Sequence, residues 1–217
     1  MSDARPIRLA VISSGLSVPS STRMLADRLA SATRDVLESY GRAVTTDVIE
    51  VKDLAHDIVD ATLTHFANER LQKAIDLVKA ADGVIAVTPI FNLSYAGLFK
   101  SFIDVIDEGA FAGVPVLLGA TGGTARHSLA IDYTLRPLFT YLKATPLPTS
   151  VFAASEDFGS PTTAPHTTPL TTRTHTAATA LAHSLLPTPS PSPTPTPTPK
   201  DNFTNFTPMT HLLPPPP

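Results

Sequence analysis

The sequence predicts an α/β fold in which five parallel strands form one sheet between two layers of helices. Two observations support this fold class. Short apolar segments alternate with longer segments of helical periodicity along the first 160 residues. In addition, most of the apolar segments are continuous rather than alternating apolar and polar, which is typical of strands buried on both faces of a parallel sheet.

The expected elements follow one another along the chain with little space between them. Five segments are predicted as strands: 7–13, 44–51, 83–89, 114–120 and 147–153. Four segments between them carry apolar residues at helical spacing and are predicted as helices: 20–40, 62–81, 95–107 and 126–143. Ser20 or Ser21 can act as the N-cap of the first of these. A last helix is expected over 168–186, although its many threonines lower its helix propensity.

The composition of the chain changes near residue 160. Fifteen of the 22 prolines follow Gly159, and formal charge after that point is confined to Arg173, Lys200 and Asp201. The segment PTPSPSPTPTPTPK can form neither a helix nor a central strand, so we expect it to be extended. The predicted organisation is a folded domain over 1–160, a candidate last helix within 161–186, and a Pro/Thr-rich linker and C-terminal tail over 187–217.

Charge and residue content exclude several classes of function. A formal net charge of −3 gives no electrostatic reason to expect nucleic acid as a partner. The absence of cysteine excludes disulfides, thiolate metal ligands and a cysteine nucleophile, and the seven histidines lack the spacing of zinc ligands. No segment reaches the ~18 consecutive apolar residues of a membrane span, and no apolar signal-peptide core follows the start. We therefore expect a cytoplasmic protein without membrane or metal.

The segment SSGLSVPSSTR, residues 13–23, follows the first predicted strand and is rich in hydroxyl groups. Five of its hydroxyl side chains are candidate ligands of a phosphate: Ser14, Ser17, Ser20, Ser21 and Thr22. Gly15 allows close approach of the backbone, and the helix that follows starts with unpaired N–H groups and a partial positive charge. These features favour a phosphate site, although the segment is neither a Walker loop nor GxGxxG. The alternative is a flexible turn before an N-capped helix.

Two further segments follow the third and fourth predicted strands. In TPIFNLSY, residues 88–95, Pro89 stiffens the backbone and an aromatic side chain can cover a flat ring, while Asn92 and Ser94 can either cap the next helix or contact a ligand. In GATGGTARHS, residues 119–128, a pair of glycines exposes backbone N–H groups. The basic Arg126 and His127 come next, and an arginine at the start of a helix favours an anionic partner. The alternative is a glycine-rich turn between strand and helix with two solvated basic residues.

These three segments are expected to meet at one edge of the sheet. In a sheet of order 2-1-3-4-5, the first, third and fourth strands are neighbours, and ligands bind beyond their carboxyl ends. A phosphate at the first segment and a flat heterocycle against the other two is the layout of an FMN site.

The same segments resemble the NADPH-dependent FMN reductase family of flavodoxin-like proteins, which also contains quinone and azo reductases. The resemblance covers residues 5–160 and rests on SSGLSVPSST, TPIFNLSYAGLFKSFID and ATGGTARHSL. In the middle segment the matching residue types are Pro89, Phe91, Asn92, Ser94, Gly97, Lys100 and Asp104. Phe91 stands where the family usually has tyrosine, which keeps the stacking surface and loses a hydroxyl. The third segment looks like a subgroup that supplies reduced FMN to luciferase-like monooxygenases.

The resemblance implies a flavodoxin-like three-layer fold, FMN and NADPH (or NADH) as cofactors, and a homodimer or homotetramer in which a partner subunit completes the pocket. It implies that the five hydroxyl residues of the first segment hold the FMN phosphate. It also implies that Pro89, Ile90, Phe91, Asn92 and Ser94 line the ring and the ribityl chain, and that Thr121, Gly122 and Gly123 contact the ring edge. Arg126 is our expected contact for the nicotinamide-cofactor phosphate. No side chain is expected to act as an acid or base, because the cofactors carry the chemistry.

The predicted function is hydride transfer from a nicotinamide to the flavin N5, with a partner monooxygenase as a candidate recipient of reduced FMN. Three alternatives stay open at this point: a quinone or azo reductase with bound FMN, a non-catalytic flavodoxin-like electron carrier, and an interaction scaffold built on the Pro/Thr tract. The segment DNFTNFTPMTHLL, 201–213, resembles the carboxyl end of the family, and disorder or an altered reading frame is the other explanation for the tail.

Overall fold

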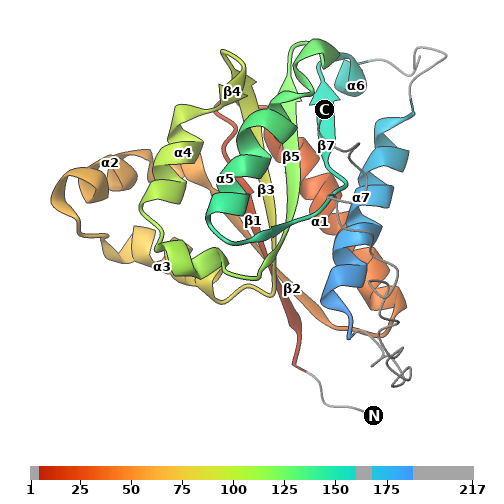
Figure 1. Cartoon of the computed structure of the whole chain (residues 1–217), viewed down its shortest axis with the longest axis horizontal. Helices are drawn as coiled ribbons and strands as arrows, with labels where there is room; N and C mark the ends of the chain where they lie inside the picture. The colour runs from red at the N-terminus through yellow and green to blue at the C-terminus, as the bar shows by residue number, and fades with distance from the viewer. Residues whose placement is uncertain (1–4, 160–167, 188–217) are drawn as a thin grey trace, which may run out of the picture. The chain divides into compact units, whose positions relative to one another are not determined.

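A computed structural model of the chain describes residues 5–159 and 168–187. Its sheet has the order β2-β1-β3-β5, with β6 and β7 both running parallel beside β5 and with the short β4 antiparallel to β3 (Figure 1). The strands are β1 (Ile7–Ser13), β2 (Val44–Glu50), β3 (Gly83–Phe91), β4 (Ser94–Tyr95), β5 (Pro115–Gly122), β6 (Thr145–Pro146) and β7 (Val151–Ala154). The predicted order 2-1-3-4-5 is confirmed, because β5 is the fourth predicted strand and the fifth corresponds to β6 and β7.

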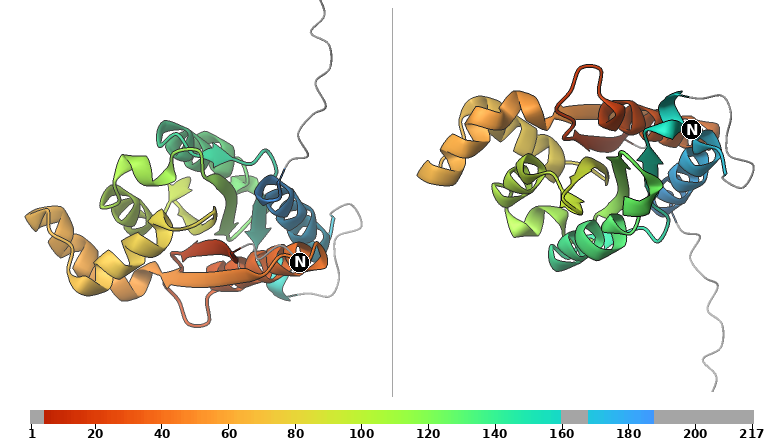
Figure 2. Two further views of the ribbon diagram at one scale, coloured as in Figure 1. Left: turned by 90° about the horizontal axis from the view of Figure 1, so that it is seen from below. Right: turned by 90° about the horizontal axis from the view of Figure 1, so that it is seen from above.

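Helices cover both faces of the sheet (Figure 2). Helices α1 and α7 lie on one face, and α3, α4 and α5 lie on the other. The helices are α1 (Ser21–Ser39), α2 (Ala55–Thr64), α3 (Glu69–Lys79), α4 (Gly97–Asp104), α5 (Arg136–Tyr141), α6 (Glu156–Gly159) and α7 (Leu170–Leu185), with shorter turns η1 (Val51–Leu54), η2 (Glu108–Phe111), η3 (Ala125–His127) and η4 (Ile131–Leu135). The predicted three-layer α/β arrangement is therefore present.

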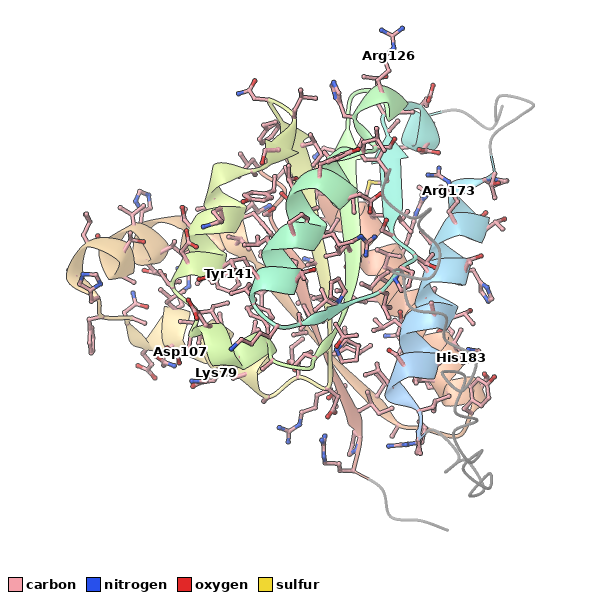
Figure 3. All side chains as sticks on the ribbon, viewed as in Figure 1. Lys79, Asp107, Arg126, Tyr141, Arg173 and His183 are labelled. Carbon is pink, nitrogen blue, oxygen red and sulfur yellow. The ribbon has the colours of Figure 1, made fainter. Side chains whose placement is uncertain are left out.

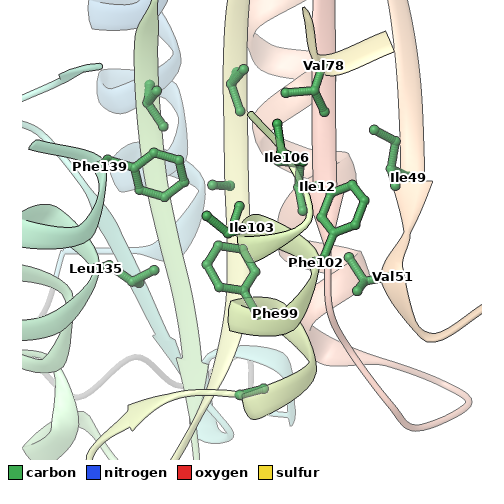
Figure 4. Close-up of a cluster of buried hydrophobic side chains, with 14 of the residues drawn as sticks. Ile12, Ile49, Val51, Val78, Phe99, Phe102, Ile103, Ile106, Leu135 and Phe139 are labelled. Carbon is green, nitrogen blue, oxygen red and sulfur yellow. The ribbon is translucent and has the colours of Figure 1, made fainter. Parts of the chain in front are cut away.

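The two faces of the sheet bury two separate apolar cores. On the α1 and α7 face, Leu25 and Leu29 pack with Leu181 over β1, β3 and β5. On the other face, aromatic side chains fill the space between sheet and helices (Figure 4). The rings of Phe111 and Phe139 meet edge to face with centroids 5.5 Å apart. Burial of both faces leaves the edges and ends of the sheet as the places where polar chemistry can occur.

The segment predicted as one helix over 62–81 contains the end of one helix and the whole of another. Helix α2 ends at His65, whose left-handed backbone (φ 60°) stops the helix. Helix α3 then starts after Asn68, whose side-chain oxygen accepts a hydrogen bond from Leu71 N at 2.9 Å. The continuous periodicity of the sequence concealed this break, and α2 itself was not predicted.

Two more elements differ from the prediction in detail. The helix expected over 126–143 begins with the turn η3 and a π-helical turn, η4, before it becomes the short α5. The strand expected over 147–153 is divided into β6 and β7, which pair with different parts of β5. The helix expected over 168–186 is present as α7, which packs against α1. The regular spacing of apolar residues in the sequence does not reveal such local interruptions.

The C-terminal tail and its segment 201–213 lie outside the described residues. The division of the chain into 1–160, 161–186 and 187–217 therefore stays a prediction. Among the helices of residues 5–159 and 168–187, none combines the length and apolarity needed to cross a bilayer.

An ion pair fastens the start of the chain to the amino end of the sheet. Asp82 accepts hydrogen bonds from Arg5 Nη1 at 2.8 Å and from Arg5 Nη2 at 2.6 Å. It also accepts one from the backbone N–H of Arg8 at 2.9 Å. The guanidinium of Arg5 lowers the pKa of Asp82 below its usual value, against the opposing effect of partial burial.

This lowered pKa predicts an acid-side loss of stability. A carboxylate whose pKa is depressed in the folded state contributes stability above the unfolded-state pKa of about 3.9, and the contribution is lost as the pH falls through the folded pKa. We expect the wild type to be more stable than Asp82→Asn by a constant amount above about pH 5, with the difference shrinking below about pH 4. Urea denaturation of both proteins from neutral to acidic pH measures it. A difference that stays constant over that range would contradict the assignment.

Candidate functional site

A pocket of about 340 Å³ lies at the carboxyl ends of β1, β3, β5 and β7, the end of the sheet that carries β4 and α6 in Figure 1. Its lining residues are Leu16, Ser17, Ser21, Thr22, Pro89, Ile90, Phe91, Thr121, Gly122, Gly123 and Ser155. All three segments singled out in the sequence contribute to this lining. Among these described lining residues none is charged, so the pocket offers only hydroxyl, backbone and apolar groups.

The hydroxyl residues of the first segment have different environments. Ser17 and Ser21 are exposed and line the pocket. Ser14 is fully buried, and its hydroxyl donates to the carbonyl of Val87 at 3.4 Å. Ser20 is the N-cap of α1, because its hydroxyl oxygen accepts a hydrogen bond from Arg23 N at 3.2 Å. Ser14 and Ser20 thus shape the segment, while Ser17 and Ser21 present hydroxyls to the pocket.

A close backbone approach makes Gly15 part of this arrangement. A Cβ atom at Gly15 would lie 1.9 Å from Ser20 Oγ and 3.0 Å from Thr22 Cβ. Both of those side chains are buried and lie at the start of α1. Any larger residue at position 15 must therefore displace the helix cap, which means that glycine is required for the segment to fold back on the helix.

The start of α1 is suited to an anion. The helix has 19 residues and no acidic side chain in its first turn, so its partial positive charge is not neutralised there. The only basic residue of that turn, Arg23, bonds to Asp27 Oδ1 at 2.8 Å and to Glu50 Oε1 at 2.5 Å. These hydrogen bonds raise the pKa of Arg23 above its usual value. Arg23 thereby ties α1 to the end of β2 and is not among the lining residues.

Thr22 connects the first segment to the third. Its hydroxyl lies 2.8 Å from the hydroxyl of Thr121, and both side chains are buried. This contact joins two segments that are 99 residues apart in the sequence. It holds the start of α1 against the end of β5.

The second segment forms a tight hairpin between β3 and β4. Phe91 pairs with Ser94, and the two residues between them have positive φ, 49° at Asn92 and 65° at Leu93. Asparagine tolerates this conformation, whereas leucine in it costs roughly 1–2 kcal/mol. Phe91 lines the pocket; Asn92 and Ser94 lie outside the lining and do not cap α4, whose N-cap is Ala96.

The third segment brings the backbone of β5 to the pocket and then turns into solvent. A Cβ atom at Gly122 would lie 2.8 Å from Phe152 Cζ, whereas one at Gly123 would meet nothing within 4 Å. Thr124 then accepts a hydrogen bond from Arg126 N at 3.3 Å. The side chain of Arg126 is exposed and extends away from the body of the protein (Figure 3). It lies near the pocket in sequence but outside its lining.

Sequence reasoning did not identify two lining residues, Leu16 and Ser155. Leu16 lies within the first segment but is apolar, whereas the residues predicted there to contact a ligand all carry hydroxyl groups. Ser155 directly follows β7, and its N–H donates to the carbonyl of Gly122 at 3.1 Å. The rule that ligands bind beyond the carboxyl ends of parallel strands applies to this strand as well, so the signal for Ser155 was present.

A comparison with protein families assigns the chain that forms this pocket. The model of the NADPH-dependent FMN reductase family matches residues 7–159. The chain belongs to this family. As a member of the FMN reductase family it is an oxidoreductase that works with FMN and a reduced nicotinamide nucleotide, NADPH or NADH.

Individual relatives of the family support the assignment. An FMN reductase (NADPH) of Pseudomonas aeruginosa is 36% identical over 155 residues, which span 70% of this chain and 80% of the relative. The NADH-dependent FMN reductase SfnE of Pseudomonas putida is 34% identical over 152 residues, which span 70% of this chain and 79% of the relative.

Solved structures share the fold. An oxidoreductase from Corynebacterium diphtheriae has a TM-score of 0.78 at 42% identity, covering 84% of this chain and 97% of that one. The apo form of an NADH:FMN oxidoreductase, EMOB, has a TM-score of 0.71 at 30% identity, covering 85% and 92%. A flavodoxin, WrbA-like protein from Agrobacterium tumefaciens, 14% identical with a TM-score of 0.53, shows that the fold is flavodoxin-like.

The contact of Gly15 with the helix cap yields a prediction. Gly15→Ala places a methyl group where Ser20 Oγ lies, so we expect a loss of about 2 kcal/mol or more in the free energy of unfolding and a distorted first segment. Gly109→Ala is the matched control, because a Cβ atom at Gly109 meets nothing within 4 Å. Denaturant unfolding of both variants measures the effect. Equal stability of the two would show that the segment adapts without cost.

Proposed function

We propose that the pocket binds FMN and that the chain reduces it with NADPH or NADH. The observation that carries the proposal is the meeting of a hydroxyl-bearing helix start, a proline-stiffened strand end and a diglycine strand end in one uncharged pocket. Its volume is within the range of about 300–1,000 Å³ usual for small-molecule sites. Membership of the FMN reductase family supports FMN as the ligand, and the residue assignments below are part of the proposal.

The start of α1 fits the phosphate of FMN. Backbone N–H groups and the helix dipole stabilise an anion without a basic side chain, and the first turn contains no acidic residue that would oppose it. The exposed hydroxyls of Ser17 and Ser21 supply further donors. In this assignment Thr22 positions the segment through its bond with Thr121, and Ser14 and Ser20 hold the backbone in place.

The ends of β3 and β5 fit a flat ring. Pro89, Ile90 and Phe91 supply apolar surface, and Gly122 and Gly123 expose backbone. The half-exposed Phe91 is an available stacking surface, since it lies at the rim of the pocket rather than in the core. Asn92 and Ser94 contribute by forming the hairpin that holds Phe91 in place.

FMN held by these residues would supply the redox chemistry of hydride transfer from the nicotinamide. The protein needs to hold the two ring systems in register and to stabilise negative charge at the ring edge. Backbone N–H groups near Gly122 and Gly123 are donors that can serve this second purpose. Because the hydride passes directly between cofactors, no side chain has to act as an acid or a base.

The phosphate assignment predicts a selective loss of affinity. Replacing both Ser17 and Ser21 by alanine removes two hydroxyl donors, so we expect FMN to bind about tenfold or more weakly while riboflavin binding changes little. Quenching of flavin fluorescence on titration measures both dissociation constants. Ser39→Ala, at the far end of the same helix, is the control. Equal losses for FMN and riboflavin would overturn the assignment.

The Arg126 assignment predicts a change in nicotinamide preference. The exposed guanidinium follows Gly123 closely in the chain, and we propose that it contacts the 2′-phosphate that distinguishes NADPH from NADH. Arg126→Ala should raise the KM for NADPH about tenfold and leave the KM for NADH unchanged. Steady-state oxidation of both nucleotides with FMN measures this. Arg8→Ala, at the amino end of β1, is the control, and an equal effect on both nucleotides would contradict the assignment.

The finer features expected from the sequence stay part of this proposal: a homodimer or homotetramer, a cytoplasmic location, and a flavin-dependent monooxygenase as the recipient of reduced FMN. The rate of NADPH or NADH oxidation with added FMN, compared with the rates with a quinone and with an azo dye, distinguishes an FMN reductase from a quinone or azo reductase. A non-catalytic carrier would bind flavin without appreciable oxidation of NADPH or NADH.

A further inference from the structure

Arg173, in the first turn of α7, joins three segments of the chain. Its Nε donates to the carbonyl of Thr168 at 3.0 Å, its Nη1 donates to the carbonyl of Phe152 in β7, and its Nη2 pairs with Asp157 Oδ1 in α6. The side chain is 30% exposed and that of Asp157 is 16% exposed. The fork of a guanidinium holds all three acceptors at once, which the single ammonium of lysine cannot do in the same geometry.

Asp157 continues this connection toward the pocket. Its second oxygen, Oδ2, accepts a hydrogen bond from the backbone N–H of Ala154 at 2.8 Å. Asp157 therefore connects the end of β7 to α6, across the turn between them, through its bond with Ala154. Its other oxygen is paired with Arg173 of α7. The residue inside that turn is Ser155.

The held turn forms part of the pocket wall. Ser155 lines the pocket, and its N–H donates to the carbonyl of Gly122, which is also a lining residue. The ring of Phe152, whose carbonyl Arg173 binds, packs so closely on Gly122 that a Cβ there would lie 2.8 Å from it. Both routes from Arg173 thus end at the same edge of the pocket, where the ends of β5 and β7 lie side by side.

We propose that Arg173 and Asp157, here called the α7 clasp, are positioning residues that fix the Gly122–Ser155 wall against the ring end of the bound flavin. The inference rests on the proposed function, because it assumes that the pocket holds a flavin. Arg173 lies beyond residues 7–159, the part of the chain that the family model matches. The clasp makes α7 part of the flavin site rather than a cover for the sheet alone.

The test is the flavin affinity of Arg173→Gln and Asp157→Asn, titrated with FMN and with riboflavin. Because the clasp acts on the ring end, both variants should bind both flavins about tenfold more weakly, since binding must then order a wall that the clasp no longer holds. This pattern differs from that of the Ser17 and Ser21 replacement, which should affect FMN alone. Arg173→Lys should restore part of the affinity, since it retains the charge but not the fork.

A matched control separates positioning from general stability. Arg5→Gln breaks a bidentate ion pair with Asp82 at the amino end of the sheet, and it should leave both flavin affinities unchanged. The double variant Arg173→Gln with Asp157→Asn should bind flavin no more weakly than either single variant, because the two residues act as a unit. If Arg173→Gln does not fold, Asp157→Asn carries the test, since its side chain keeps nearly the same shape.

The outcomes are distinguishable. Wild-type protein that binds neither flavin overturns the proposed function and this inference with it. Wild-type protein that binds flavin while the clasp variants bind it equally well, whatever their melting temperatures, overturns the clasp and leaves the proposed function standing. Equal tenfold losses for FMN and riboflavin in the clasp variants, with Arg5→Gln unaffected, support it.

Discussion

The parallel pairing of β1, β3 and β5 is the constraint on which the rest of the structure depends. Its register places Ser13 beside Val87 and Pro89 beside Thr121, so the segments that follow these strands leave the sheet at nearly the same level. Because helices bury both faces, polar groups can gather only beyond the strand ends. The pocket is a consequence of this geometry, and the residue types of the connecting segments determine what it can hold.

Much of the fold and of the site could be predicted because their signals are local. Continuous apolar segments mark the buried strands, and hydroxyl-rich or diglycine segments mark connections that approach a ligand. The break between α2 and α3 could not be predicted in this way, since the left-handed backbone of His65 has no strong signature in the sequence. The division of the last strand into β6 and β7 likewise depends on how the chain runs along β5, which periodicity does not report.

The environment of each serine in the first segment also lay beyond local reasoning. Ser14 and Ser17 are the same residue type within one short segment, yet the first is buried against a carbonyl of β3 and the second faces the pocket. The difference arises from the neighbouring strand, not from the segment itself. The same holds for the hydrogen bonds of Arg173 to Phe152 and Asp157, which form because α7 packs beside β7. Pairings across such distances require the tertiary structure.

The uncharged lining of the described pocket has a consequence for its electrostatics. Hydroxyl, amide and apolar groups do not titrate near neutrality, so these lining residues keep one charge state across the physiological range. The partial positive charge at the start of α1 comes from backbone dipoles, which do not titrate. Any change of protonation in the proposed FMN complex would therefore come from FMN itself, because the second pKa of a phosphate monoester is about 6. In the proposed complex with FMN, the lining residues would keep one charge state while the charge of the ligand changes with pH.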